Sequence, residues 1–399
     1  MKKNISFLLL FCFFCQVLLA QEKEPNYNLI KLDKKNIAAA KLKIKAGNKA
    51  VLPVYKQLLK EADESLKFKP VTVMEKKVFP PSGNKHDYMS IAPYWYPDPT
   101  KPDGLPYIRK DGQTTPEVKN YPDKQNLPRL SENIYQLSLA YYFSGEEKYA
   151  QHAAKLLKVW FLDTATKMNP NLNFGQAVKG INTGRGAGLI DARHFIFMMD
   201  GASLLEGSKH FSKANESELK KWFSDFLTWM QTSKIGKEEM EADNNHGVWY
   251  DALRLSIVNY TGDRKSAKDI VKMAAARLNV QLDTTGSFPA EMERTISLHY
   301  TVFIMQAYFI IAQLSQDTDT NLWTARTASG KSLSKAFDFL MPYITQQKTW
   351  TGQQIKPFQF QNAYPILLQG SQKFNCKECL ETVRQNKHSK TDLLLMNLL

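Results

Sequence analysis

The stretch "LSENIYQLSLAYYFSGEEKYAQHAAKLLKVWFLD", residues 130–163, decides the fold class. Apolar residues recur three and four positions apart on both sides of "SGEE", which is the pattern of two amphipathic helices joined by a short turn. Alternating, strand-like runs are scarce elsewhere in the chain. The same helical pattern recurs in residues 48–67, 192–207, 217–233, 247–263, 264–282, 296–316 and 331–344. The sequence therefore predicts an all-α protein built from antiparallel helix hairpins.

Two long segments, residues 79–127 and 168–191, interrupt this helical rhythm. Both are rich in Pro, Gly or Asn and show no helical period. Long segments of this kind in a compact domain are usually functional or disordered, and these carry too many aromatic and aliphatic residues for a solvated tail. We expect ordered loops that lie over one end of the helical domain.

The N-terminus reads "MKKNISFLLLFCFFCQVLLAQEKE", a basic start followed by an apolar run and Leu-Leu-Ala. This pattern is typical of a secretory signal peptide, with cleavage after Ala20. A lipoprotein signal on Cys12 or Cys15 is the alternative, but both cysteines lie inside the apolar run. No linker divides residues 21–399, and no later stretch has the length of a membrane span. We expect residues 1–20 to be removed, leaving residues 21–399 as one periplasmic or secreted domain.

The net charge and the cysteine content limit the kinds of ligand that the protein is expected to bind. Loss of Lys2 and Lys3 with the signal peptide would lower the net charge of +14 by two, to +12. For an exported basic protein, an acidic polysaccharide is a better partner than nucleic acid, although the charge could equally be a solvated surface. The two cysteines outside the signal peptide, Cys376 and Cys379, favour a local disulfide over half of a zinc site, because no second pair completes the metal ligands.

Polar residues cluster in "EADNNHGVWYD", residues 241–251. Asparagine is a poor helix former, so Asn244 and Asn245 mark either a helix cap or a site. His246 and Tyr250 are four residues apart and share one helical face. From these residues alone, the cap and the site are equally good interpretations.

A second cluster, "FPAEMERTISLHYT" at residues 288–301, stands where an apolar helix begins. Glu291 and Glu293 could complement the helix dipole. Arg294 could instead face a cleft, and His299 and Tyr300 need partners for their polar atoms.

The two loop segments contribute further candidates. Tyr94 and Trp95 could stack on sugar rings, and Arg109 could bind a carboxylate; covering the edge of the core is an equally good role. Gln176 precedes "NTGRGAGLID", residues 182–191, which lacks the pattern of a phosphate-binding loop. A turn is the better interpretation there, with Arg185 free to face a cleft.

Taken together, "NNHGVWY" with Asn245 and His246, followed by "EMERTISLHY" with Arg294 and Tyr300, resemble the alginate lyase family. The likeness extends over most of the chain, including residues 87–108 and 169–186. It is closest in pattern to polysaccharide lyase family 38 and more distant from family 5. The family 5 pattern has one more residue and a second Arg between its Arg and Tyr, at about the place of Ser297. This difference bears on substrate preference rather than on catalytic class.

The resemblance implies an incomplete α/α toroid with lid loops, acting as a monomeric polysaccharide lyase without metal or cofactor. The implied reaction is β-elimination on alginate or a related polyuronate such as glucuronan. Asn245, His246 and Arg294 would neutralise the C5 carboxylate, with Tyr300 as acid and, when proton and leaving group share a face, also as base. Otherwise His246 would be the base. We expect the positive charges nearby to lower the pKa of Tyr300. Further substrate contacts are expected from Asn244, Tyr94, Trp95, Gln176, Arg185, Tyr250, Glu291, His299 and Arg109.

Two alternatives are compatible with the same residues. A glycoside hydrolase would need two carboxylates flanking the bond, such as Asp243 with Glu291 or Glu293. A non-catalytic protein that binds acidic polysaccharide would use Tyr94 and Trp95 alone. The sequence does not decide between mannuronate, guluronate and glucuronate, or between endo and exo action.

Overall fold

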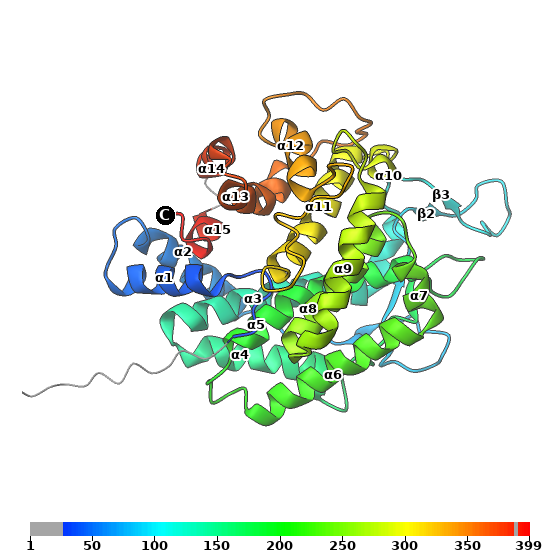
Figure 1. Cartoon of the computed structure of the whole chain (residues 1–399). Helices are drawn as coiled ribbons and strands as arrows, with labels where there is room; N and C mark the ends of the chain where they lie inside the picture. Colours follow the sequence, from blue (N-terminus) through cyan, green and yellow to red (C-terminus); the bar gives the residue numbers. More distant parts are fainter. Residues whose placement is uncertain (1–26, 387–389) are drawn as a thin grey trace, which may run out of the picture.

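A computed structural model describes residues 27–386 and 390–399, so the expected signal peptide lies outside the described residues. Most of the described chain is helical, which confirms the predicted fold class (Figure 1). The α-helices are α1 (Lys34–Lys45), α2 (Leu52–Ser65), α3 (Pro122–Ser144), α4 (Glu147–Leu157), α5 (Phe195–Leu204), α6 (Lys213–Thr232), α7 (Lys234–Met240), α8 (Asn245–Thr261), α9 (Arg264–Gln281), α10 (Pro289–Met292), α11 (Ser297–Leu314), α12 (Leu333–Ile344), α13 (Tyr364–Lys373), α14 (Lys377–Arg384) and α15 (Lys390–Leu395).

Consecutive helices pack as hairpins around two central helices. Gly145 ends α3 in the left-handed conformation, with φ of 74°, and so allows the tight turn into α4. Helices α8 and α11 pack against each other and are buried on most of their faces. At the far end of the chain α15 packs against α1 and α2, where Lys43 Nζ donates to the carbonyl of Leu399 at 2.6 Å. The two ends of the described chain therefore lie side by side.

Helix α11 is long and apolar enough to cross a membrane by composition alone. However, 72% of its apolar window is buried inside the protein. Within the described part of the chain, it is the only helix that passes this test. The sequence of α11 is that of a core helix.

The two expected loop segments are ordered and hold short strands. In one pair, β1 (Met89–Ile91) is parallel to β4 (Phe174–Ala177). In the other, β2 (Trp95–Tyr96) is antiparallel to β3 (Ile108–Arg109), and Figure 1 shows this hairpin projecting beside α7 and α10. The shorter helical turns are η1 (Val73–Glu75), η2 (Pro116–Asn120), η3 (Lys158–Leu162), η4 (Gly186–His194) and η5 (Phe360–Ala363).

Some boundaries differ from the sequence-based prediction. Helix α3 begins inside the segment expected to be a loop, because Pro122 occupies its first turn, where a missing N–H costs nothing. Helix α1 was not predicted, since only Ile37, Ala40 and Ile44 of its residues are buried. The local disulfide between Cys376 and Cys379 is confirmed, and it closes the first turn of α14.

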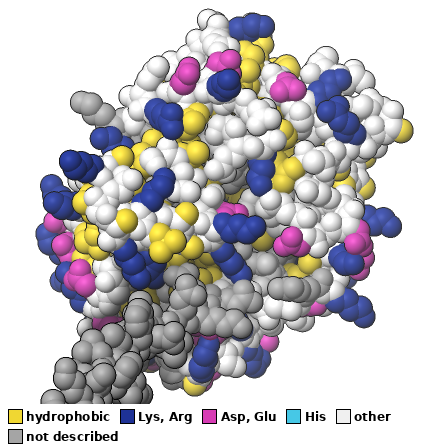
Figure 2. All heavy atoms as spheres, turned by 60° about the vertical axis from the view of Figure 1, so that its left-hand side comes forward, with side chains coloured by type: hydrophobic (Ala, Val, Ile, Leu, Met, Phe, Trp, Pro, Cys, Tyr) yellow, Lys and Arg dark blue, Asp and Glu magenta, His cyan; other side chains and the backbone are white. Residues whose placement is uncertain are grey.

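On the face shown in Figure 2, Lys and Arg side chains outnumber Asp and Glu and are scattered among polar and apolar atoms. The visible part of that face has no concentrated basic patch.

Candidate active site

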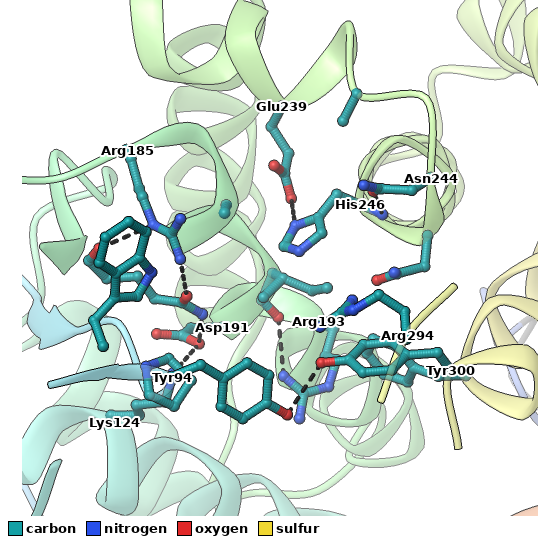
Figure 3. A pocket seen from close by; sticks show the side chains of 18 of the residues that line it. Tyr94, Lys124, Arg185, Asp191, Arg193, Glu239, Asn244, His246, Arg294 and Tyr300 are labelled. Atoms are coloured by element: carbon teal, nitrogen blue, oxygen red, sulfur yellow. Dashed lines mark hydrogen bonds and ion pairs between the residues drawn. The ribbon is translucent and has the colours of Figure 1, made fainter. Parts of the chain in front are cut away.

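A cleft of about 520 Å³ lies where the loop segments cover the ends of α7, α8 and α11. One wall carries His246 from α8 with Arg294 and Tyr300 from the start of α11, and Arg185 faces them from the loop before η4 (Figure 3). The two sequence clusters singled out above therefore meet in space.

The first turn of α8 is shaped by a cap and a close contact. The Asn244 side chain accepts the backbone N–H of His246 at 3.0 Å, so Asn244 is the helix cap. Arg277 donates to the carbonyl of Ala242 at 2.6 Å and ties down the connection from α7. Only glycine fits at position 247, because a Cβ there would lie 2.1 Å from that same carbonyl. The residue that caps α8 therefore also belongs to the cleft, so the helix cap and the site coincide.

His246 is held by a carboxylate that the sequence analysis did not identify. Its Nδ1 lies 2.7 Å from Oε1 of Glu239, on α7, whose side chain is 2% exposed. A carboxylate at Nδ1 fixes the tautomer that carries its proton there. The second ring nitrogen, Nε2, is then available to a ligand in the cleft.

Arg294 is paired with Asp111, which follows β3 in the loop segment. Nη2 of Arg294 donates to Asp111 at 2.6 Å, and Nε donates at 3.1 Å and 3.2 Å to its two oxygens. Burial alone would raise the pKa of Asp111, but the bonds from Arg294 and Thr295 outweigh it and hold the pKa well below its ordinary value. The ion pair fastens the segment after β3 to the turn between α10 and α11.

Tyr300 lies between Arg294 and the loop. The guanidinium carbon of Arg294 is 3.5 Å from the centroid of the Tyr300 ring, and the Tyr300 hydroxyl donates to the hydroxyl of Tyr94 at 3.0 Å. The expectation of a lowered pKa was wrong. Burial and the neighbouring Tyr94 raise the pKa of Tyr300 far more than Arg294 lowers it. Tyr300 is therefore a neutral phenol in the unliganded protein.

The opposite wall is organised by Gln176. Its backbone has φ of 48°, which is unusual for a residue other than glycine. Its side chain donates to Asp191 at 3.1 Å and accepts from Arg185 at 3.2 Å. Lys124 also donates to Asp191, at 2.8 Å. This network holds the Arg185 guanidinium near the ring of Trp95.

The cations of the cleft fall into two groups. Arg109, Arg294 and Lys124 each pair with a carboxylate. Within the described residues, Arg185 and Arg193 form no ion pair. Arg185 donates to the backbone and side-chain oxygens of Gln176, and Arg193 donates to the carbonyl of Ile190. The unpaired guanidinium groups are the ones best able to accept a carboxylate from a ligand.

Most of the residues proposed from sequence line this cleft. They are Tyr94, Trp95, Arg109, Gln176, Arg185, Asn244, Asn245, His246, Arg294, His299 and Tyr300. His299 is half-buried, and burial together with Arg193 and Arg294 lowers its pKa.

Two proposed substrate-binding residues do not reach the cleft. Tyr250 is fully buried and donates to the carbonyl of Met230 at 3.1 Å, because it points into the core beneath α6. Glu291 is also fully buried, and its carboxylate is bonded to Asn245. These two predictions were wrong in the same way, since a polar side chain near a site can serve the scaffold instead of the ligand.

Several cleft residues were not identified from sequence. Lys124, Asp191, Arg193 and Glu239 line the cleft, and Asp111 supports it from behind. Their sequence signals are weak, because each is a single charged residue in an otherwise ordinary helix or loop. Only contacts distant in sequence give them a role.

Comparison with known proteins identifies the family. The family model for alginate lyase matches residues 72–350. The crystal structure of an alginate lyase from Bacteroides ovatus is 39% identical, with a TM-score of 0.88 over 94% of this chain and 100% of its own.

More distant structures share the fold. Alginate lyase A1-III from Sphingomonas species A1 is 16% identical, with a TM-score of 0.51 over 80% of this chain and 88% of its own. A variant of A1-III complexed with a tetrasaccharide is 16% identical, with a TM-score of 0.56 over 88% of this chain and 89% of its own. A search of curated proteins finds no match. The match to the family model and the 39% identity over nearly the whole length show that this chain belongs to the alginate lyase family of polysaccharide lyases.

Proposed function

We propose that this chain is an exported lyase that cleaves alginate or a closely related polyuronate by β-elimination. The observation that carries the proposal is the convergence of His246, Arg294 and Tyr300 on one wall of a cleft, opposite the unpaired cation Arg185. Imidazole, guanidinium and phenol are the groups that elimination from a uronate requires. Export rests on the signal-like N-terminus and is part of the proposal.

The first task is to neutralise the substrate carboxylate. The C5 proton is poorly acidic while the adjacent carboxylate carries its charge, so fixed donors must stabilise the charge that develops on it. His246 can donate from Nε2 when its ring carries both protons, because Glu239 accepts the one on Nδ1. Arg294 offers Nη1, because Asp111 takes Nε and Nη2. Both groups are held in place before substrate binds, which is the condition for efficient electrostatic stabilisation.

The second task is proton transfer. A neutral Tyr300 suits the acid that protonates the departing 4-oxygen. In guluronate the C5 proton and the 4-oxygen lie on opposite faces of the ring, and His246 would then be the base through Nε2. In mannuronate and glucuronate they lie on the same face, and Tyr300 would first have to release its proton. The Tyr94 hydroxyl at 3.0 Å could relay that proton if it passed its own proton on to solvent.

Flanking sugars would be held by the opposite wall. Arg185 can pair with the carboxylate of a neighbouring uronate, and the ring of Trp95 can stack on its pyranose face. The hydrolase alternative loses support, because Glu291 is fully buried and bonded to Asn245. Asp243 and Glu293, its other candidates, do not line the cleft.

The test is an ultraviolet assay for the C4–C5 double bond on alginate, polymannuronate, polyguluronate and glucuronan. We expect at least one polymer to give a rising absorbance, and Tyr300→Phe to abolish it while the variant still unfolds like the wild type. A wild-type protein that leaves all four polymers uncleaved would contradict the proposal. Shortened products without the double bond would show a hydrolase.

A further inference from the structure

The buried carboxylate of Glu291 binds Asn245, which is expected to donate to the substrate carboxylate. It is the first residue of α8, and both it and Glu291 of α10 are fully buried. Oε1 of Glu291 accepts the backbone N–H of Asn245 at 2.6 Å. The side-chain Nδ2 donates to Oε1 at 3.1 Å and to Oε2 at 2.9 Å. Both nitrogens of Asn245 thus donate to one carboxylate.

The other end of the same amide has no partner. Oδ1 of Asn245 is buried and accepts no hydrogen bond from the described residues. Asn245 nevertheless belongs to the wall of the cleft. An unpaired buried carbonyl oxygen is costly, and an oxygen in this position would repel an anionic ligand rather than attract it. In this orientation Nδ2 is engaged by Glu291, and the unpaired atom of the amide is its oxygen.

Rotation of the amide by half a turn would remove both problems. Nδ2 would take the place of Oδ1 and could donate to the ligand, while Oδ1 would face Glu291. Two facing oxygens require a hydrogen between them, which an ionised carboxylate does not have. The rotated amide therefore requires a protonated Glu291, with its O–H donated to Oδ1 and its other oxygen still accepting the backbone N–H.

We propose that Glu291 is a positioning residue that sets which atom of the Asn245 amide faces the cleft, and that binding of a uronate is coupled to uptake of one proton from solvent by Glu291. The proposal rests on the lyase function proposed above. Binding forms one O–H bond on Glu291 and breaks no covalent bond of the protein. Asn245 then becomes a donor to the substrate carboxylate only when that carboxylate is present.

The surroundings of Glu291 favour such uptake. Burial raises the pKa of Glu291, while the donors of Asn245 and the positive charges of Arg294 and His246 act against it. Tyr308 of α11 also faces this carboxyl and is itself uncharged, since burial raises its pKa. A substrate carboxylate adds a negative charge beside these groups, which favours the neutral acid further. Because the folded pKa is raised, the neutral form is present at lower pH and lost as pH rises through that pKa.

The decisive variant is Glu291→Gln. A glutamine can accept the backbone N–H with its oxygen and donate to Oδ1 of Asn245 with its amide, so it permanently imitates the protonated acid. We expect Glu291→Gln to keep kcat/KM within about threefold of wild type. We also expect its pH profile to lack the decrease in activity that deprotonation of Glu291 causes in the wild type as the pH rises. Glu291→Leu can make neither bond, and we expect it to lose about a hundredfold, as when a fixed donor to developing charge is removed.

The matched control is Glu293→Gln, which removes the same charge from an exposed position two residues away. It should keep the pH profile of the wild type. A Glu291→Gln variant that is folded but as inactive as Glu291→Leu would overturn the proposal. So would a Glu291→Gln variant with an unchanged pH profile.

Calorimetry measures the coupling without turnover. Tyr300→Phe, titrated with alginate or glucuronan in buffers of different ionisation enthalpy, should take up a proton on binding, and Tyr300→Phe/Glu291→Gln should take up less. Equal uptake by the two variants would overturn the proposal. If Tyr300→Phe takes up the expected proton but the wild-type protein cleaves no polyuronate, the proposed function alone is overturned. If neither polymer binds, both the function and the role of Glu291 are overturned.

Discussion

Asp111→Asn tests whether the segment after β3 holds Arg294 in place. Asparagine keeps the shape of the side chain and one acceptor, but it loses the charge that receives two guanidinium nitrogens of Arg294 and one of Arg109. The Asp111 and Arg294 side chains are only 18% and 15% exposed, so solvent screens this pair less than a surface pair. Hydrogen bonds to charged groups contribute about 1.5–3 kcal/mol, against about 0–1 kcal/mol for exposed pairs. We expect the free energy of unfolding to fall by about 2 kcal/mol.

The same substitution should slow the reaction. Arg294 lies 3.5 Å from the Tyr300 ring centroid while Asp111 holds it, and a released guanidinium would no longer keep that position. Since about 1.4 kcal/mol corresponds to a tenfold change in rate, loss of half of the expected ~2 kcal/mol, which is about 1 kcal/mol, would lower kcat about fivefold. Urea unfolding followed by tryptophan fluorescence gives the stability, and initial rates in the ultraviolet assay give kcat.

A control in the neighbouring β2–β3 loop separates charge from position. Asp103 is exposed and accepts the backbone N–H of Leu105 at 3.0 Å, and no cation of the described residues forms an ion pair with it. Asp103→Asn should leave both kcat and the stability close to wild type. If Asp111→Asn unfolds at the same urea concentration as Asp103→Asn and reacts as fast, Asp111 does not hold Arg294 and the reasoning is refuted.

Three further predictions concern the supports of the cleft. Glu239→Gln should lower kcat at least about tenfold with little change in urea unfolding, because it removes the charge beside the candidate base His246. General base catalysis contributes about 10²–10⁴-fold to a rate. An unchanged kcat would exclude a role of Glu239 in supporting that base. Gly247→Ala should cost about 1–3 kcal/mol of stability by overpacking and should also lower kcat, since its Cβ would lie 2.3 Å from Arg277 Nη1; a variant with normal stability would show that this turn can shift. Burial would raise the pKa of Asp191, but Lys124, Gln176 and Ser90 outweigh it and lower the pKa. The ionised Asp191 therefore stabilises the folded protein above the ordinary carboxyl pKa, and this contribution is lost as the pH falls through the lowered value. Lys124→Met should therefore reduce the loss of melting temperature between neutral and acidic pH, and an unchanged loss would contradict this account.

The sequence predicts best what depends on local order. Helical periodicity identifies most of the helices, because an apolar stripe at three- and four-residue spacing is a property of adjacent residues. It fails for α1, where three buried residues suffice to pack the helix. The cap at Asn244 was also within reach of the sequence, since capping joins a side chain to a backbone group two residues away.

What the sequence could not predict is the partner of each site residue. His246, Arg294 and Asn245 were all expected to act as donors, and each is bonded to a carboxylate: Glu239, Asp111 or Glu291. These pairs join residues brought together only by the packing of α7, α8, α10 and the loop segment. Periodicity and motif spacing do not encode such pairings.

The pairing has a consequence for how a polyanion would bind. In the unliganded protein, carboxylates already balance the charge of the central donors, so the centre of the cleft is not simply cationic. Arg185 and Arg193 form no ion pair within the described residues and would provide the initial attraction for flanking uronates. The central donors would then act on the one carboxylate brought close enough to compete with Asp111 and Glu239. In the proposed function, attraction of the polymer and activation of a single sugar are thus assigned to different side chains. Neutralising Arg185 should accordingly raise KM for polymer with little change in kcat, whereas neutralising Arg294 should lower kcat.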